Sequence, residues 1–329
     1  MSTATISFPG LGLTMDPPQG FSVGPLYINI YGILIALGLM MAVIYACRRA
    51  NQFGLKEDDI LDGVLWVTPL AIVCARLYYV IFEWEHYASD PISILYIWNG
   101  GLAIYGGVIG ALVGVAVLCK VKKIKLPALL DLVALGFLIG QAIGRWGNFF
   151  NREAYGSEAT HFLRMGLQSF DQTVYVHPTF LYESLWNAAG FLLLHKLSKK
   201  RRYDGQIALG YVAWYGLGRA FIEGLRTDSL YWGPFRVSQL LAALSCVAAV
   251  IVLLLQHFKE HDPKDLLVNK APEENTEETE EKAEEAAEET EEATEETAEE
   301  TEEVAGETAE ETEEVTEEAA EETEEKTEE

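Results

Sequence analysis

Residues 131–156, DLVALGFLIGQAIGRWGNFFNREAYG, join an almost uncharged apolar run to a cluster of polar side chains. In hydrocarbon such polar groups cost several kcal/mol unless they are paired or face a wet cavity. The stretch therefore indicates a membrane helix that ends in a functional site or, alternatively, in an interfacial cap whose long side chains reach water. The polar residues are Arg145, Asn148, Asn151, Arg152 and Glu153.

The stretch contains the fourth of seven apolar runs that are near the length needed to cross a bilayer, about 20 residues. The sequence thus predicts an all-α, polytopic integral membrane protein with about seven transmembrane helices. We expect one membrane domain from residue 1 to 260, with a small extracytoplasmic insertion at about 147–179. The expected helices cover residues 28–47, 63–82, 102–119, 128–143, 180–194, 207–222 and 237–255, of which the fourth and fifth are short.

Basic residues in the short loops predict the orientation of these helices. Lysine and arginine gather after the first, third and fifth runs, as is typical of cytoplasmic loops. The N-terminus is therefore expected outside and the C-terminus in the cytoplasm. The basic residues are Arg48, Arg49, Lys56, Lys120, Lys122, Lys123, Lys125, Lys196, Lys199, Lys200, Arg201 and Arg202.

The net charge of −26 comes from the end of the chain. Residues 271–329 contain 31 Glu and 2 Lys, which leaves 22 basic and 19 acidic residues in the rest. Because Glu, Thr and Ala offer little apolar surface to bury, we expect residues 261–329 to form a disordered cytoplasmic tail. A Glu-rich helix is the alternative, which repulsion between like charges at i,i+4 opposes. Such a tail repels nucleic acid, so no nucleic-acid partner is expected.

A second set of charged residues lies in the sixth run, in YGLGRAFIEGLR at 215–226. Arg219, Glu223 and Arg226 have the i, i+4 and i+7 spacing of one helix face, at the same predicted depth as Arg145. A guanidinium group matches phosphate oxygens and stays charged when it is desolvated. The two helix ends therefore predict a pocket for an anionic phospholipid, with purely structural ion pairs between the helices as the alternative.

Other polar residues are predicted at the same outer level. Tyr31 lies near the outer end of the first run and Tyr105 near that of the third, while HPTFLYESLWN at 177–187 opens the fifth with His177 and Glu183. The alternative interpretation is that Tyr31 and Tyr105 are ordinary tyrosines of the membrane interface and that His177 is a loop or capping residue. The four cysteines form no CxxC pair, and the sequence identifies no metal site and implies no cofactor.

The segment GRWGNFFNREAYG resembles the signature of the prolipoprotein diacylglyceryl transferase family, Gly-Arg-x-Gly-Asn-Phe-x-Asn-x-Glu-x-x-Gly. Three more segments resemble family segments in the same order, namely NIYG with Tyr31, HPTFLYE at 177–183 and YGLGRAFIEGLR at 215–226. The resemblance extends from about residue 27 to 255. The signature matches at every fixed position: Gly144, Arg145, Gly147, Asn148, Phe149, Asn151, Glu153 and Gly156.

The resemblance implies a multi-pass enzyme of the bacterial inner membrane that acts at the outer leaflet. Such an enzyme moves the diacylglyceryl group of phosphatidylglycerol, a membrane lipid, onto the lipobox cysteine of a prolipoprotein and releases glycerol phosphate, the first step of lipoprotein maturation. Arg145 and Arg219 would hold the phosphate and stabilise its growing charge. The implied catalytic residues are Arg145, Arg219, Asn148, Glu153, Glu223 and Tyr31, and the implied lipid-binding residues are Arg145, Arg219, Gly156, Tyr105 and Arg226.

Tyr105 departs from the family pattern, because some members have a histidine there that has been considered the base for the cysteine. A neutral tyrosine accepts protons poorly at neutral pH, so the base stays unassigned. The acidic tail has no counterpart in the family pattern and is expected to be dispensable for catalysis. Two other functions are open: a transporter or channel, disfavoured because the polar residues avoid the midplane, and an inactive lipid-binding scaffold.

Overall fold

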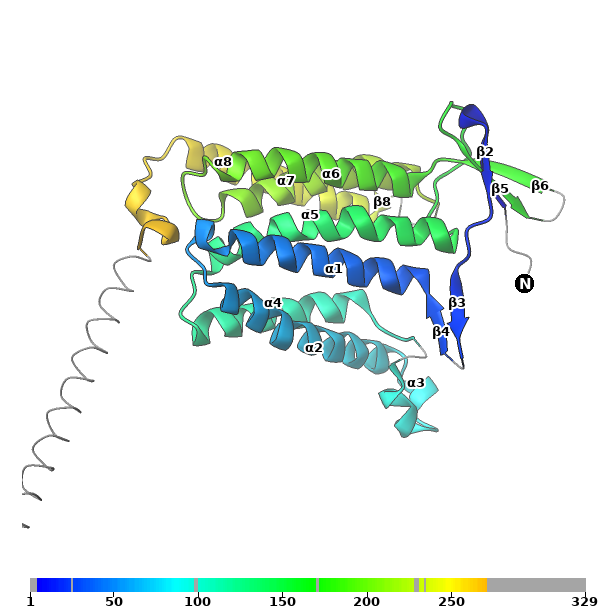
Figure 1. Ribbon diagram of the computed structural model, residues 1–329, viewed down its shortest axis with the longest axis horizontal. Helices are drawn as coiled ribbons and strands as arrows, with labels where there is room; N and C mark the ends of the chain where they lie inside the picture. Colours follow the sequence, from blue (N-terminus) through cyan, green and yellow to red (C-terminus); the bar gives the residue numbers. More distant parts are fainter. Residues whose placement is uncertain are drawn as a thin grey trace, which may run out of the picture. The chain divides into compact units, whose positions relative to one another are not determined.

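The computed structural model describes residues 5–24, 26–97, 100–169, 172–227, 231–233 and 235–270. Long helices run side by side through these residues and form a bundle (Figure 1). The described residues also contain a short helix, α3 (Trp84–Tyr87), and the 3-10 turns Pro9–Leu11, Ala50–Phe53, Pro91–Leu95, Glu223–Leu225 and Pro263–Asp265. The long helices are α1 (Ile30–Arg49), α2 (Glu57–Phe82), α4 (Ile104–Val121), α5 (Leu126–Asn151), α6 (Thr179–Ser198), α7 (Gln206–Ile222) and α8 (Val237–His257).

The lengths and compositions of these helices agree with a multi-pass membrane protein. Five segments of the described chain are long and apolar enough to cross a membrane: Ile30–Phe53, Glu57–Phe82, Ile104–Val121, Leu126–Asn151 and Val237–His257. α6 and α7 coincide with the fifth and sixth predicted helices and pack beside α5 and α8. That α6 and α7 also cross the membrane, which would give seven crossings, therefore remains a prediction.

α5 is the central helix of the bundle, and α1, α6 and α7 pack against it. Its buried leucines recur at helical spacing, with Leu132, Leu135 and Leu138 fully buried. Near its start, the buried carboxylate of Asp131 accepts hydrogen bonds from the backbone amides of Gly205 and Ala208, both at 2.8 Å, where α7 begins. α5 is also longer than the predicted 128–143, because it has 26 residues and ends only at Asn151.

Short strands gather at one end of the bundle, which we call the strand end (Figure 1). An antiparallel sheet has the order β2-β1-β5-β6, and two hairpins pair β3 with β4 and β7 with β8. The all-α prediction included no strands, so these strands correct it. The fold is mostly helical, with short strands at one end. The strands are β1 (Thr5–Phe8), β2 (Leu13–Met15), β3 (Gly20–Val23), β4 (Leu26–Asn29), β5 (Met165–Ser169), β6 (Gln172–Val176), β7 (Tyr231–Trp232) and β8 (Phe235–Arg236).

The sheet packs on the bundle through its own apolar cluster. Ile6 and Phe8 of β1 and Met165 of β5 are buried together with Phe149 near the end of α5 and Phe180 near the start of α6. These aromatic contacts include the rings of Phe149 and Phe180, whose centroids are 5.0 Å apart. The cluster fixes the end of α5 against the start of α6, which is where the predicted site residues lie.

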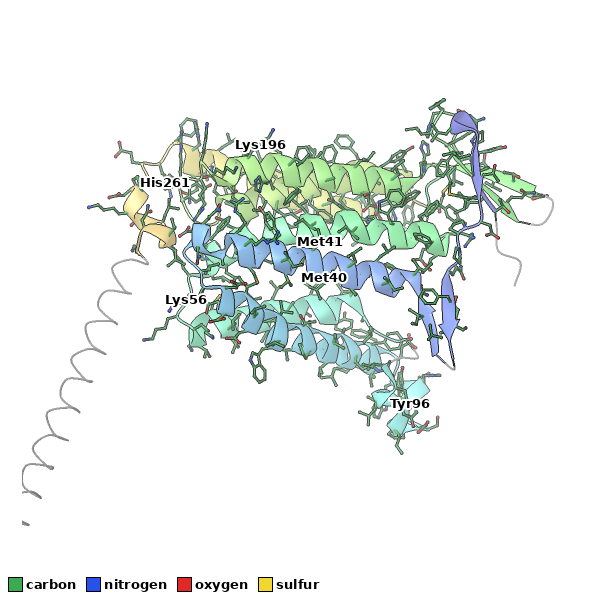
Figure 2. All side chains as sticks on the ribbon, in the orientation of Figure 1. Met40, Met41, Lys56, Tyr96, Lys196 and His261 are labelled. Carbon is green, nitrogen blue, oxygen red and sulfur yellow. The ribbon has the colours of Figure 1, made fainter. Side chains whose placement is uncertain are left out.

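At the opposite end of the bundle, the chain after α8 folds back over the loops (Figure 2 labels His261 there). The His261 ring stacks on Tyr203 at 4.6 Å, Lys125 Nζ donates to the Asp265 carbonyl at 2.7 Å, and the Leu267 amide donates to Asp204 Oδ2 at 3.0 Å. Residues 261–270, which the sequence analysis assigns to the tail, thus belong to the compact unit 1–270. The predicted disorder of the acidic residues 271–329 lies outside the described residues.

Candidate active site

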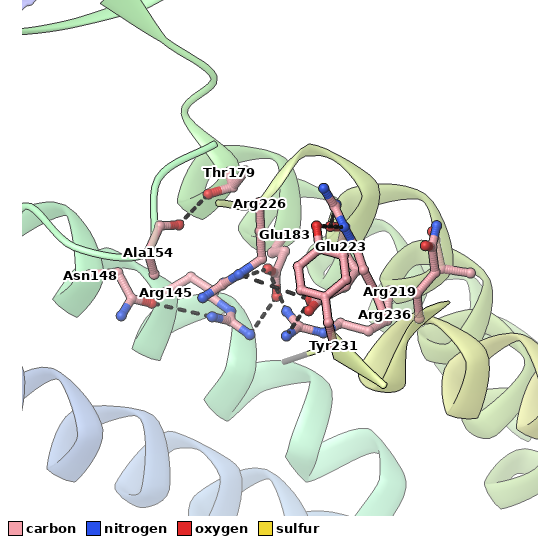
Figure 3. Close-up of polar contacts among 12 residues, drawn as sticks. Arg145, Asn148, Ala154, Thr179, Glu183, Arg219, Glu223, Arg226, Tyr231 and Arg236 are labelled. Carbon is pink, nitrogen blue, oxygen red and sulfur yellow. Dashed lines mark hydrogen bonds and ion pairs between the residues drawn. The ribbon is translucent and has the colours of Figure 1, made fainter. Parts of the chain in front are cut away.

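Arg145 and Asn148 lie on one face of α5, one turn apart, at the strand end (Figure 3). Arg145 Nη1 donates to Asn148 Oδ1 at 3.3 Å, and Asn148 Nδ2 donates to Glu153 Oε1 at 3.0 Å. α5 ends just before Glu153 because Arg152 adopts a left-handed conformation, with φ 56°. The turn brings the Glu153 carboxylate back beside the helix end, so Asn148 links Glu153 to Arg145.

Glu183, on the first turns of α6, forms ion pairs with three arginines, of which one lies on α5, one on α7 and one just after α7 (Figure 3). Its Oε2 lies 2.5 Å from Arg145 Nη2, and its Oε1 lies 3.0 Å from Arg219 Nη1 and 3.5 Å from Arg226 Nη1. The predicted sets around Arg145 and Arg219 therefore meet in one cluster. Sequence reasoning places Glu183 at this level but misses that it joins the two sets.

Glu223 supplies the second carboxylate of the cluster, where α7 gives way to a 3-10 turn. Its Oε2 lies 2.7 Å from Arg219 Nη2 and 3.9 Å from Arg226 Nε. The Arg236 guanidinium donates from Nη1 to the Glu223 carbonyl and from Nε to the Tyr231 hydroxyl, the latter at 2.8 Å. Arg236 is a further cation at the site that sequence reasoning misses, and its position at the start of an apolar run is the signal that marks it.

The burial of the cluster is uneven. The two carboxylates are almost fully buried, with side chains of Glu183 4% and of Glu223 3% exposed, whereas that of Arg145 is 23% and that of Arg219 19% exposed. Opposite charges this close offset part of the desolvation cost that burial imposes on each group. The two carboxylates are thus buried more deeply than the side chains of Arg145 and Arg219.

Arg226 and Gly156 meet through their backbones at the edge of the cluster, where they form an isolated antiparallel bridge. The Gly156 amide donates to the His177 carbonyl at 2.9 Å. A side chain at Gly156 would come within 2.7 Å of His177 Cβ and 3.0 Å of the Leu225 carbonyl oxygen. The signature glycine is therefore needed for this close approach of three segments beside the arginines.

The chain matches the family model described as prolipoprotein diacylglyceryl transferase over residues 18–255, a range that contains all these residues. The chain belongs to the prolipoprotein diacylglyceryl transferase family. It is similar to proteins named phosphatidylglycerol–prolipoprotein diacylglyceryl transferase from three bacteria. Identity is 43% with that of Listeria welshimeri (77% of this chain, 95% of the relative), 42% with that of Limosilactobacillus reuteri (74% and 92%) and 44% with that of Bacillus cytotoxicus (71% and 90%).

The two tyrosines predicted for the site differ in their surroundings. Tyr31, on the first turn of α1, lies with its ring directly against Gly147 of α5, where any side chain would collide with it. Tyr105 lies on α4, which packs against α2, with its ring 6.4 Å from that of Tyr78 and 59% of the residue exposed. Tyr31 thus packs against the signature glycine that directly precedes Asn148, whereas the described ring contact of Tyr105 is with Tyr78 of α2.

Two other arginines at this end are occupied by structural contacts. Arg76 of α2 donates to the carbonyls of Ser93, Ile94, Gly100 and Gly101 at 2.7–2.9 Å, which holds the loop before α4. Arg152 lies 2.6 Å from Asp16 and donates to the Pro17 carbonyl at 2.8 Å, which ties the N-terminal segment to the end of α5. Within the described residues, no group of three or more His, Cys, Asp and Glu side chains is placed to hold a metal ion.

Proposed function

We propose that Arg145 and Arg219 bind the phosphate of phosphatidylglycerol, and that Glu183 and Glu223 hold the two guanidinium groups in position. The family and its named relatives assign the reaction: this chain is a transferase that moves a diacylglyceryl group from phosphatidylglycerol to a prolipoprotein. That step is the first in lipoprotein maturation. The observation that carries the proposal is the single carboxylate of Glu183 shared by arginines from α5, α7 and the turn after α7.

The reaction places its developing charge on the phosphate. In our proposal the sulfur of the lipobox cysteine attacks the carbon of the diacylglyceryl group that is bonded to the phosphate oxygen. An S–C bond forms and the C–O bond between that carbon and the phosphate breaks. The electron pair leaves with the phosphate oxygen, glycerol phosphate departs, and the thiol proton passes to a base that stays unassigned. Preorganised guanidinium groups stabilise the second negative charge that the leaving phosphate gains.

Each guanidinium group has donors left for this role. The contacts described above engage Nη1 and Nη2 of both arginines, and a guanidinium group carries five N–H bonds in a fixed plane. Because both side chains are partly exposed, the remaining N–H groups of Arg145 and Arg219 are available to phosphate oxygens. Asn148 and Tyr31, which line the same end of α5, are proposed to contact the headgroup or the peptide.

The proposed membrane orientation follows from charge. The strand end carries the cluster, and the basic loops that follow α1, α4 and α6 lie at the opposite end. The positive-inside rule assigns those loops to the cytoplasm and the strand end to the outer leaflet. We propose seven crossings in the bacterial inner membrane, with α6 and α7 included because they lie side by side with the other helices (Figure 1).

A mass assay tests the proposed reaction directly. Purified protein in detergent is incubated with phosphatidylglycerol and a lipobox peptide, and the peptide mass and released glycerol phosphate are measured. We expect a gain of one diacylglyceryl group that disappears when the peptide cysteine is replaced by serine. Arg145→Ala is expected to lower the rate about 100- to 1000-fold, the loss typical of one group that stabilises developing charge. Arg202→Ala, an exposed arginine at the opposite end, is the matched control.

A normal transfer rate in folded Arg145→Ala protein would exclude the phosphate role of that residue. Lipid binding without transfer to any peptide would instead favour the scaffold interpretation.

A further inference from the structure

A pocket lies at the strand end between α7 and α8, beside the β7–β8 hairpin. Its volume of about 380 Å³ is typical of sites for small ligands or single side chains. We call it the α7–α8 pocket. Its lining includes Ala220 of α7, Tyr231 and Arg236 of the hairpin strands, and Gln239, Leu240 and Ala243 of α8.

The α7–α8 pocket adjoins the arginine cluster, and Figure 3 shows Arg236 and Tyr231 next to Arg219 and Glu223. Arg236 donates from Nη1 to the Glu223 carbonyl, and the Glu223 carboxylate lies 2.7 Å from Arg219 Nη2. Ala220, in the pocket lining, directly follows Arg219 in the chain. A ligand held in the pocket therefore lies next to the groups that we propose to bind the phosphate.

The residues next to the lining face lipid in the proposed membrane orientation. Phe221 of α7 is 71% exposed, and Leu241 and Leu244 of α8 are 64% and 59% exposed. Each of these three directly follows a residue of the lining. Because α8 is long and apolar enough to cross a membrane, its exposed apolar side chains contact hydrocarbon rather than water. A ligand can therefore reach the pocket from within the outer leaflet.

Two polar side chains give the pocket both kinds of hydrogen-bonding group. Gln239 Nε2 donates to the Ala220 carbonyl at 2.8 Å, which fixes the amide and leaves its Oε1 as an acceptor. Arg236 donates from Nε to the Tyr231 hydroxyl at 2.8 Å and from Nη1 to the Glu223 carbonyl. Its Nη2 group keeps two N–H donors. The pocket thus presents an acceptor and a charged donor, both held in place, beside an apolar lining.

This combination matches an extended polypeptide better than a lipid. At membrane depth, a chain that leaves the helical conformation must find partners for its own N–H and C=O groups. Gln239 can accept from a backbone amide, Arg236 can donate to a backbone carbonyl, and the apolar lining fits an aliphatic side chain. The phosphate and ester groups of a phospholipid only accept, and the hydroxyls of a glycerol head group bring no apolar part for the lining.

We propose that the α7–α8 pocket docks the acceptor polypeptide. Gln239 and Arg236 hold the backbone next to the reacting cysteine, and an apolar side chain of the same segment packs against Leu240 and Ala243. The inference rests on the proposed function, which makes the acceptor a prolipoprotein. Since Arg236 also contacts the Glu223 carbonyl, it links the docked acceptor to the arginines that hold the donor.

A peptide that cannot react separates docking from catalysis. A fluorescent lipobox peptide with serine in place of its cysteine is titrated with the full-length protein in detergent, and fluorescence anisotropy gives Kd. Ala243→Leu fills the pocket, so we expect it to raise Kd at least about tenfold, within the range of overpacking costs. Ala248→Leu, at an exposed position of α8 outside the lining, is the matched control and should bind as the wild type does.

A second variant guards against a disturbed packing of α8 in Ala243→Leu. Leu240 is 41% exposed, so Leu240→Ala leaves the helix packing intact but removes apolar surface from the lining. We expect it to raise Kd about three- to tenfold, the effect of losing contacts with one or two methylene groups. Leu241→Ala, one position further and more exposed, is its control. The KM for phosphatidylglycerol should keep its wild-type value in both pocket variants.

Wild-type Kd in folded Ala243→Leu and Leu240→Ala proteins would overturn the docking proposal. A higher KM for phosphatidylglycerol with an unchanged peptide Kd would overturn it as well, because it would show that the pocket takes lipid. Kd values that change as expected, without lipid transfer by any protein, would leave the docking site standing and refute the proposed function.

Discussion

Replacing Glu183 by glutamine tests the centre of the proposed mechanism. The change keeps the shape of the side chain and removes one charge. Oε1 faces Arg219 and Arg226, while Oε2 faces Arg145. The glutamine amide must direct its NH2 group toward one side or the other, so in either orientation at least one guanidinium group loses its acceptor and meets a donor instead.

The expected magnitude follows from burial. The Glu183 side chain is 4% exposed, and its contact with Arg145 is 2.5 Å long. Removing one partner of a buried ion pair costs about 3–5 kcal/mol, although glutamine recovers part of this through its carbonyl oxygen. Misplacing one guanidinium group should lower the rate of transfer about 100- to 1000-fold, which is about 2.7–4 kcal/mol of transition-state stabilisation.

Initial rates of peptide lipidation measure the effect, together with circular dichroism and thermal unfolding of the same preparation. Glu85→Gln, which alters an exposed carboxylate of α3, is the matched control and should retain the wild-type rate. Wild-type turnover in folded Glu183→Gln protein would refute the reasoning, because it would show that the shared carboxylate does not position the arginines.

Two further predictions test the packing that supports the site and the role of the C-terminal residues. Gly147→Ala should push the Tyr31 ring off α5 and lower the free energy of unfolding by about 1–3 kcal/mol, as overpacking does. In the control Gly32→Ala, on α1, the added methyl group meets nothing within 4 Å and should be tolerated. Thermal unfolding compares the two variants. A stop codon after Lys270 removes the acidic tail and should leave both the transfer rate and the melting temperature unchanged. A stop codon after Phe258 should lower the melting temperature, because it also removes the contacts of His261, Asp265 and Leu267. Equal melting temperatures for the two truncated proteins would show that residues 259–270 do not stabilise the bundle.

The helices were predictable from the sequence because a bilayer demands long apolar runs, and their positions agree within a few residues except at α5 and at the start of α2, which begins at Glu57 instead of the predicted residue 63. α5 extends to Asn151 because its polar end residues are paired within the protein, which a rule based on apolar runs does not anticipate. Helical spacing predicted that Arg145 and Asn148 share a face of α5 and that Arg219 lies one turn from Glu223. The predicted continuation of that helix face to Arg226 is wrong, because α7 ends at Ile222 and Arg226 follows a 3-10 turn in an extended conformation.

What could not be predicted depends on contacts between distant segments. β1 pairs with β5 across more than 150 residues, and the short strands have no alternation strong enough to indicate it. Glu183 stands alone in an otherwise uncharged run, so its sequence spacing does not relate it to either arginine set. Its role becomes visible only once α6 is packed between α5 and α7, which brings three guanidinium groups to one carboxylate.

The net charge of the cluster is compatible with the proposed anionic lipid, although two buried carboxylates belong to the cluster. Apart from Arg236, the three arginines and two glutamates of the ion-paired cluster carry a net charge of +1, which is opposite to the −1 of the phosphodiester in the proposed lipid. In the proposed reaction the phosphate gains a second charge when the C–O bond breaks, and the remaining N–H groups of Arg145 and Arg219 would stabilise it. Glu183→Gln would raise the net charge to +2 and attract the lipid more strongly while holding the guanidinium groups less well. We therefore expect kcat to fall more than kcat/KM, the pattern of a site that has exchanged transition-state stabilisation for ground-state binding.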